Sequence, residues 1–309
     1  MTTRRPTTRR RFIAISAALA ASAAMPAAAA PVAQIHTGTA LGAKATLRIA
    51  HPDAAAIAER AFAEIDRLED ILSLYRPDSA LVRLNRDGQL DAPPFELLDC
   101  LALAGAVHHG SDGSFDPTVQ PLWMLWAKAA MKENRPETAE IAAVLQHVGW
   151  GRVTTEADRI ALHPGTELTL NGIGQGYVAD RVADLLAAEG LSDILVDTGE
   201  MRALGGQPGG GDWPVTLQAG GKIGLRDRAL ATSAPLGTSF DEAGHDGHIL
   251  DPRTGAPVRS IWREVSISAP SAALADALAT AACMQPDEES LHKLIAGFPG
   301  ARIEAAHRT

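Results

Sequence analysis

The hydrophobic patterning of this chain changes near Gly151, and this change limits the possible folds more than any other feature. Before Gly151, apolar residues recur at helical spacing, as at Ile57, Ala61 and Ile65. After it, short apolar runs of strand length are separated by turns rich in glycine and proline. No internal repeat or clean linker interrupts the sequence. This order predicts an α+β fold in a single compact unit, in which a helix-rich N-terminal half packs with a mixed β-sheet from the C-terminal half.

The same spacing, together with capping and turn residues, predicts the individual elements. Helices are expected at residues 52–72, 93–109, 119–130, 137–148, 177–189, 272–284 and 287–296, with a short helix starting at Ser79. Strands are expected at residues 44–50, 159–163, 167–170, 194–196, 214–218, 229–233 and 264–269. Asp116 is expected to cap the helix at 119–130, with Pro117 at its first position. The strands at 159–163 and 167–170 are expected to pair across the turn between them.

Composition excludes several classes of function. Of the 309 residues, 46% are apolar and 21% are charged, which is typical of a folded protein. The net charge is −9, and residues 1–30 hold five arginines and no acids, so the rest of the chain carries −14. Such acidity argues against nucleic acid or anionic lipid as the main partner. Cys100 and Cys283 are too few for a zinc cage, and their apolar helical surroundings favour buried free thiols over a disulfide, which stays open.

Residues 1–30 have the order of features found in an export signal. Arg9, Arg10, Arg11 and Phe12 precede a mostly alanine stretch, and the small residues 27–30 offer cleavage sites. This pattern favours a twin-arginine signal peptide over an arginine-rich tail, leaving residues 31–309 as the mature domain. The apolar stretch is too short for a good membrane anchor. We therefore expect a soluble periplasmic protein without a stable membrane anchor.

A glycine-rich loop, residues 170–177, lies between an expected strand and an expected helix. Glycines at such a place let a ligand approach the backbone, and the helix N-terminus offers free N–H groups to a phosphate. The pattern is not G-x-G-x-x-G and no acidic residue follows at a suitable distance, which disfavours a dinucleotide Rossmann site. A tight turn without a ligand remains the alternative for this loop.

Two further segments carry candidate chemistry. Asp276 and Thr280 share one face of an otherwise apolar helix, and a carboxylate there is costly unless it is paired or bound to a cation. This pair suits Mg²⁺, although the aspartate could instead accept backbone N–H bonds. His248 precedes a strong turn at 251–255 and could act as a general acid or base, or be structural. A metal pair with His245 is disfavoured because no third soft ligand is near.

Taken in order, these segments resemble the motif series of the ApbE family of FAD:protein FMN transferases. The resemblance covers about residues 36–300 and rests on residues 39–42, 72–79, 113–118, 170–180, 231–233, 248–255 and 275–280. The form of residues 170–177, the stretch 195–200 and the twin-arginine signal look like the NosX branch. That branch is associated with flavinylating NosR, a membrane protein that supports nitrous oxide reductase.

The resemblance implies a reaction and a set of site residues. FAD would bind with Mg²⁺ at its pyrophosphate, a threonine hydroxyl of another protein would attack the FMN phosphorus, and AMP would leave. By motif match, the Gly172 carbonyl, Asp276 and Thr280 would be the metal ligands, and His248 would assist proton transfer. FAD contacts would fall on Leu41, Tyr75, Ser114, Phe115, Asp116, Thr169, Gln175 and Leu250. The acceptor would be NosR-like or another periplasmic FMN-binding domain.

The chain departs from the family pattern at a few of these positions. Many relatives carry an acidic residue where Thr169 stands and a lysine or glutamate where Gln175 stands. Leu41 replaces a methionine, and Ala234 replaces a glycine. Two other functions therefore stay open: a non-catalytic periplasmic flavin-binding maturation factor, and an FAD pyrophosphatase in which water replaces the threonine.

Overall fold

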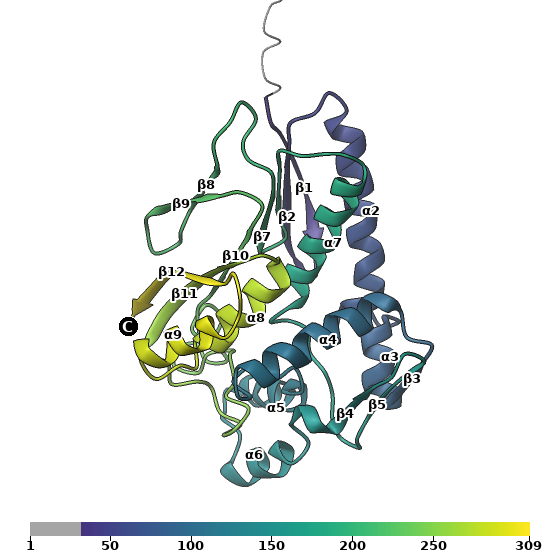
Figure 1. Cartoon of the computed structure of the whole chain (residues 1–309). Coiled ribbons are helices and arrows are strands. Elements are labelled where there is room, and N and C mark those ends of the chain that lie inside the picture. Colours follow the sequence, from purple (N-terminus) through teal and green to yellow (C-terminus); the bar gives the residue numbers. More distant parts are fainter. Residues whose placement is uncertain (1–31) are drawn as a thin grey trace, which may run out of the picture. The chain divides into compact units, whose positions relative to one another are not determined.

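An antiparallel sheet of seven strands organises residues 32–309, which are the residues that the computed structural model describes (Figure 1). The strand order is β1-β2-β6-β7-β10-β11-β12, and every pair in it is antiparallel. The strands are β1 (Gln34–Ala40), β2 (Ala43–Ile49), β6 (Ile194–Asp197), β7 (Met201–Leu204), β10 (Ala229–Ser233), β11 (Trp262–Ala269) and β12 (Arg302–Arg308). Two of the seven strands come from the N-terminal part of the chain. The predicted signal peptide at residues 1–30 lies outside the described residues.

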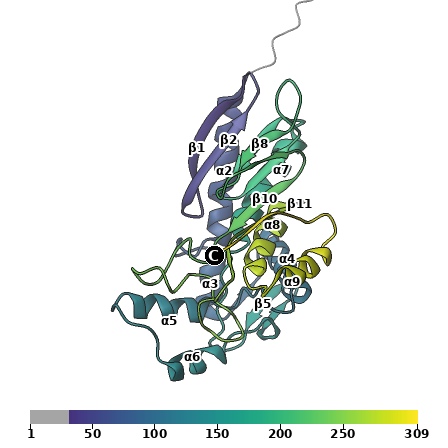
Figure 2. The same cartoon turned by 90° about the vertical axis from the view of Figure 1, so that its left-hand side faces the viewer.

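Three helices cover one face of this sheet (Figure 2). They are α2 (Ala54–Leu72), α7 (Gly174–Ala188) and α8 (Ala272–Ala282). In β6, Ile194 and Val196 point toward the helices, whereas Leu195 points to the other face and packs in a second apolar cluster. That cluster includes Trp213 of the hairpin formed by β8 (Trp213–Thr216) and β9 (Lys222–Leu225). Because both faces are covered, β6 is apolar at successive positions.

Of the remaining helices and strands, only α5 (Gln120–Ala130) contributes a residue, Trp123, to the wall of the cavity described below. A second sheet of three strands has the order β3-β5-β4. Its strands and the other helices are β3 (Gln89–Asp91), β4 (Val153–Thr155), β5 (Arg159–Leu162), α3 (Ala80–Asp87), α4 (Phe95–Gly110), α5 (Gln120–Ala130), α6 (Thr138–Leu145), the 3-10 turn η1 (Trp150–Arg152) and α9 (Glu288–Ala296). The predicted helices are all present, with ends that differ by a few residues.

One predicted strand pairing is wrong. Residues 159–162 form β5, but β5 pairs with β3 and β4 and not with residues 167–170. The turn at Gly165 has a φ of +81° and carries the chain away from β5, and Thr166 donates its hydroxyl to the His147 carbonyl at 2.9 Å. Glu167 instead makes an isolated parallel bridge to Val119. The sequence correctly predicts a turn at residues 164–165, but the pairing partner of each strand is set by contacts with residues distant in sequence.

The predicted cap of α5 is also wrong. The N-cap of α5 is Val119, and the helix starts at Gln120 with Pro121 in its first turn. Asp116 Oδ1 accepts hydrogen bonds from the backbone N–H and the hydroxyl of Thr118, at 2.8 and 2.6 Å. The aspartate therefore closes a local turn in front of the helix instead of capping the helix itself.

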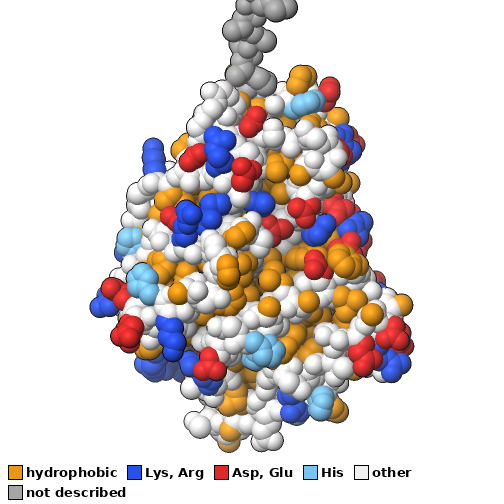
Figure 3. Space-filling view, viewed as in Figure 1, with side chains coloured by type: hydrophobic (Ala, Val, Ile, Leu, Met, Phe, Trp, Pro, Cys, Tyr) orange, Lys and Arg blue, Asp and Glu red, His pale blue; other side chains and the backbone are white. Residues whose placement is uncertain are grey.

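The cysteines are buried, and the surface carries charges of both signs. Cys100 and Cys283 are both buried and free, as predicted, and burial raises the pKa of the Cys283 thiol to about 12. On the face in Figure 3, arginine and lysine side chains are interspersed with acidic ones. Within residues 32–309, none of the helices combines the length and the apolar composition that crossing a bilayer requires.

Candidate active site

A cavity of about 420 Å³ lies where α7, α8 and two long loops meet. Its walls include ten of the twelve residues that the sequence predicted for the site. These ten are Ser114, Phe115, Asp116, Thr169, Gly172, Gln175, His248, Leu250, Asp276 and Thr280. They come from four separate parts of the chain, so the fold brings together residues that are up to 166 positions apart, from Ser114 to Thr280.

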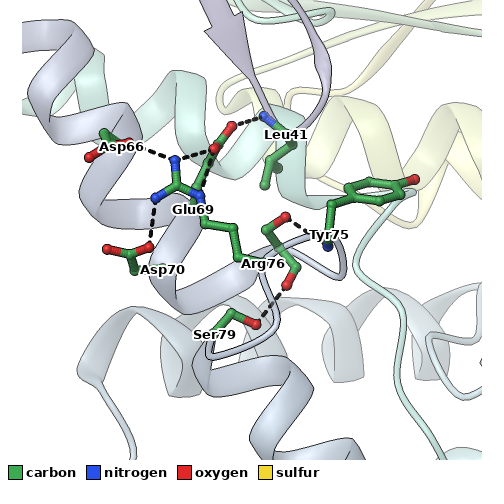
Figure 4. A network of polar contacts seen from close by, with 8 residues as sticks. Leu41, Asp66, Glu69, Asp70, Tyr75, Arg76 and Ser79 are labelled. Atoms are coloured by element: carbon green, nitrogen blue, oxygen red, sulfur yellow. Dashed lines mark hydrogen bonds and ion pairs between the residues drawn. The ribbon is translucent and has the colours of Figure 1, made fainter.

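The other two predicted residues, Leu41 and Tyr75, lie beside the start of α7 and not on the cavity wall (Figure 4). Leu41 Cδ1 would lie 3.2 Å from a Cβ placed on Gly174, so its side chain contacts the first turn of α7. The Tyr75 side chain packs near Gly42 and is 68% exposed. An exposed aromatic ring at this place is free to contact a ligand that extends beyond the cavity.

A network of ion pairs holds the β1–β2 turn that carries Leu41 (Figure 4). Leu41 has a φ of +48°, and its N–H donates to Glu69 Oε1 at 2.5 Å. Arg76 donates to Glu69, Asp66 and Asp70 at 2.5, 2.6 and 2.6 Å. These three carboxylates raise the pKa of the Arg76 guanidinium. The strained turn is thus fixed by a carboxylate that is itself fixed by an arginine.

The contact between α7 and α8 positions α8, which carries Asp276 and Thr280, beside the cavity. A Cβ on Gly176 would lie 2.2 Å from the Ala272 carbonyl oxygen, so only glycine permits the observed approach. Asp180 of α7 caps α8 by accepting the N–H groups of Ala272 and Ala273 at 2.8 and 2.9 Å. Burial raises the pKa of Asp180 to about 6, although these two hydrogen bonds lower it. The cap and the glycine together fix which face of α8 meets the cavity.

That face presents Asp276 and Thr280 to the Gly172 backbone. A Cβ on Gly172 would lie 3.1 Å from Thr280 Oγ1, which shows how closely the loop and the helix meet. Asp276 is only 4% exposed and accepts one hydrogen bond, from the Gly176 N–H at 3.3 Å. Burial raises the pKa of Asp276 to about 7. A buried carboxylate with a single long hydrogen bond is poorly compensated by the protein alone.

These oxygen donors fit a divalent cation. Among residues 32–309 the cavity has no lysine or arginine in its wall, and Asp276 forms no ion pair. No group of three histidine, cysteine or acidic side chains with metal-binding spacing occurs in that part of the chain. One carboxylate, one hydroxyl and a carbonyl is the sparse oxygen set that suits Mg²⁺, which keeps waters and takes further oxygens from phosphates.

His248 enters the cavity from the loop between β10 and β11. Its Nδ1 lies 3.0 Å from the Thr238 carbonyl, and because a carbonyl only accepts, Nδ1 carries the proton. The neutral ring therefore has its lone pair on Nε2, where it can accept a proton. The loop is anchored on α5, since Trp126 Nε1 donates to the Gly255 carbonyl at 2.9 Å. Its neighbour His245 is exposed and faces Asp241 at 3.6 Å, outside the cavity.

The segment at 114–116 forms a rigid wall of the cavity. The Phe115 carbonyl lies 2.9 Å from His108 Nδ1, and the Phe115 N–H donates to Ser111 Oγ at 3.1 Å. Gln285 Nε2 reaches Ser114 Oγ at 3.4 Å. Ser114 and Phe115 are thus held by hydrogen bonds to other parts of the chain, and this pre-organises the segment for a ligand.

The cavity wall also holds an acidic residue that the sequence did not predict for the site. Glu200 lies at the tip of the hairpin between β6 and β7 and lines the cavity with Asp276. Burial, with a further contribution from the negative charge of Asp276, raises the pKa of Glu200. The sequence does carry a signal for Glu200, because it is an acidic residue directly after a glycine turn at the end of a buried strand. Burying a carboxylate at such a place costs free energy unless it has a partner.

The chain is similar to one family of known proteins. The model of the ApbE family matches residues 39–300. The chain is 27% identical over 261 residues to the FAD:protein FMN transferase of Haemophilus influenzae, covering 76% of this chain and 75% of that protein. It superposes on the apo form of the flavinyl transferase ApbE of Pseudomonas stutzeri with a TM-score of 0.75 and 27% identity, covering 85% of this chain and 88% of the other.

A second solved structure shows the same fold. The crystal structure of the ApbE protein of Thermotoga maritima matches with a TM-score of 0.78 and 28% identity, covering 90% of this chain and 97% of the other. The ApbE-like α+β fold expected from the sequence is therefore confirmed.

Proposed function

The chain belongs to the ApbE family and is a flavinyltransferase, and we propose that it is a Mg²⁺-dependent enzyme that moves FMN from FAD to a threonine hydroxyl of an acceptor protein and releases AMP. The observation that carries this proposal is the buried Asp276, which lines one cavity with Thr280, the Gly172 backbone and His248. One cavity thus holds oxygen donors for a cation and a nitrogen for a proton.

The reaction assigns a task to each group. The acceptor hydroxyl oxygen forms a bond to the phosphorus of the FMN half of FAD, the bond from that phosphorus to the bridging oxygen breaks, and AMP leaves with that oxygen. The hydroxyl proton passes to Nε2 of His248, the free ring nitrogen. Asp276, Thr280 and the Gly172 carbonyl would hold Mg²⁺, which would supply positive charge for the phosphates of FAD.

The charge of the cavity supports the need for a cation. Phosphoryl transfer depends on positive charge and on positioning more than on a covalent intermediate. In the described part of the chain, no lysine or arginine lines this cavity, whereas Asp116, Glu200 and Asp276 do. Apart from His248, the titratable side chains that a diphosphate would meet there are carboxylates, so the proposed reaction requires a cation between them and the phosphates.

The acceptor and the compartment are further parts of the proposal. The twin-arginine pattern at residues 1–30 supports periplasmic export, and the form of residues 170–177 supports a NosR-like acceptor or another periplasmic FMN-binding domain. Fusing residues 1–40 to a reporter that is active only after export tests the first part. Replacing Arg9, Arg10 and Arg11 by lysine is expected to abolish export of that fusion.

The transfer reaction is tested by mixing the protein with FAD, Mg²⁺ and a periplasmic FMN-binding domain, and reading flavin fluorescence on a denaturing gel. We expect a fluorescent acceptor band that EDTA abolishes. Release of AMP and free FMN without an acceptor would instead identify an FAD pyrophosphatase. Tight FAD binding without AMP release would identify a non-catalytic flavin-binding maturation factor.

The two loop histidines provide a matched pair of variants for the same assay. His248→Ala is expected to slow transfer by about 10²–10⁴-fold, the usual contribution of a positioned general base. His245→Ala, three positions earlier and outside the cavity, is expected to leave transfer unchanged. Equal rates for the two variants would remove His248 from the mechanism.

A further inference from the structure

Glu200 is a second carboxylate in the cavity wall, supplied by a different element from the one that carries Asp276. It follows β6 and precedes β7, which pair with each other from Asp197 and Met201 onward. Asp276 lies in the middle of α8, on the helical layer that covers the sheet. The two carboxylates therefore reach one cavity from two layers of the fold.

The hairpin tip that carries Glu200 is fixed to the start of α7. Thr198 Oγ1 donates to the Gln175 carbonyl at 2.9 Å. Gly199 has a φ of +103°, and a Cβ there would lie 2.9 Å from Gln175 Oε1, so the tip packs tightly on this side chain. The Gly199 N–H donates to Asp197 Oδ1 at 3.1 Å. These contacts between the hairpin tip and Gln175 fix the position of Glu200 relative to α7.

Neither cavity carboxylate has a positive partner in the described part of the chain. Glu200 and Asp276 take part in no ion pair there, and Asp276 accepts a single hydrogen bond, from the Gly176 N–H. Asp276 is 4% exposed, and its Oδ1 accepts no hydrogen bond from residues 32–309. Two acidic side chains that face one cavity repel each other unless a cation lies between them.

We propose that Glu200 is a further ligand of the divalent cation held by Asp276, Thr280 and the Gly172 carbonyl. The proposal rests on the function proposed above for this cavity. A second carboxylate brings the protein's negative charge at the site to two, which matches the charge of the cation. The cation should then bind firmly before FAD arrives, because affinity for a hard cation rises with the number of charged oxygen ligands.

The test measures binding of Mn²⁺, as a spectroscopic probe for Mg²⁺, to the full protein without FAD. The free Mn²⁺ signal in electron paramagnetic resonance gives the dissociation constant. We expect Glu200→Gln to raise that constant by about 10–100-fold, and Asp276→Asn to raise it at least as much. Glu242→Gln, an exposed acid outside the cavity, is the matched control and should bind as the wild type does.

Two further measurements separate ligand loss from unfolding. Glutamine has the shape of glutamate without its charge, so Glu200→Gln should keep or raise the melting temperature in EDTA. Added Mn²⁺ should raise the melting temperature of the wild type more than that of Glu200→Gln. Glu200→Asp keeps the charge, and should bind Mn²⁺ more tightly than Glu200→Gln.

The outcomes separate this proposal from the one on which it rests. Wild-type Mn²⁺ affinity in Glu200→Gln, together with lost affinity in Asp276→Asn, would overturn the role of Glu200 and keep the cation site. Wild-type affinity in both variants would overturn the cation site itself, and the role of Glu200 with it.

Discussion

The α7–α8 contact and the β1–β2 turn both lie against the N-terminal end of α7, but different forces hold them. At the first, Gly176 brings two helix backbones together, and Asp180 caps α8 from a buried position. At the second, Glu69 and Arg76 hold the Leu41 N–H through ion pairs that involve the more exposed Asp66 and Asp70. The first region is fixed by close backbone packing and by a largely buried carboxylate, which also pairs with Arg202 at 3.3 Å, whereas the second is fixed by charges near water.

The difference predicts how each region responds to change. A backbone contact inside the core has no room to relax, so one added methyl group must displace a helix. An ion pair in contact with water contributes little, because water and salt replace most of its energy. The residues proposed to bind the cation are on the packed side, and the exposed Tyr75 is on the charged side. Substitutions on the two sides should therefore differ in size and in salt dependence.

The largest effect on stability is expected from Gly176→Ala. Its Cβ would lie 2.2 Å from a backbone oxygen of α8, so the helix must shift, at a cost of about 1–3 kcal/mol in the free energy of unfolding. Denaturant unfolding measures that cost. Gly151→Ala is the control, since nothing lies within 4 Å of its Cβ, and it should change stability by less than about 0.5 kcal/mol. Equal costs for both variants would show that the close approach of α7 and α8 does not limit stability.

Asp180→Asn should have an intermediate effect, with a particular dependence on pH. Burial raises the pKa of Asp180 to about 6, so between pH 4 and pH 6 the folded state binds more protons at this group than the unfolded state. Its contribution to stability is therefore greatest below pH 4 and is lost as pH rises through 6. The variant should lose that slope, and the weaker cap should cost about 0.5–2 kcal/mol near pH 4.

Urea unfolding at pH 4 and pH 7 in EDTA measures both quantities for wild type and Asp180→Asn. The wild type should lose more stability between the two pH values than the variant loses. An identical loss in both proteins would mean that Asp180 does not titrate in this range.

The smallest effects are expected at the β1–β2 turn. Asp66→Asn removes one ion pair of Arg76 and should cost less than about 1 kcal/mol. Glu69→Gln removes the charge next to Leu41 but keeps an oxygen that can accept its N–H, so its cost should be similarly small. In 1 M NaCl the difference between wild type and either variant should shrink. A cost as large as that of Gly176→Ala would show that this turn is also fixed by packing.

The sequence predicted local structure well where one pattern decides it. The apolar spacing of α2, from Ile57 to Leu68, follows the core face of the helix. The glycine-rich segment does lead into α7, but the helix already begins at Gly174, and no strand precedes it directly. Gly176 was expected to give a ligand access to the backbone, but its nearest neighbour is the backbone of α8. A glycine shows that something approaches closely, and only the tertiary structure shows what approaches.

Features that depend on distant contacts could not be read from the sequence. The position of Glu200 depends on the pairing of β6 with β7, and Arg202 in β7 interrupts the apolar pattern by which strands are recognised. The true partners of β5 are set by β3 and β4 and not by the turn that follows β5. The order of the motifs did predict Gly172, Asp276 and Thr280 as site residues, and the fold places all three in the wall of one cavity. A series of motifs in order identifies a family more specifically than any one of its motifs.

We propose above that Asp276 holds the cation on which FMN transfer depends. The most direct test measures the rate of transfer to a periplasmic FMN-binding domain against Mg²⁺ concentration, for wild type and Asp276→Asn. We predict a saturable dependence on Mg²⁺ for the wild type, no transfer in EDTA, and a rate at least about 10²-fold lower for the variant at every concentration. Transfer at the wild-type rate by Asp276→Asn, or by the wild type in EDTA, would contradict the account.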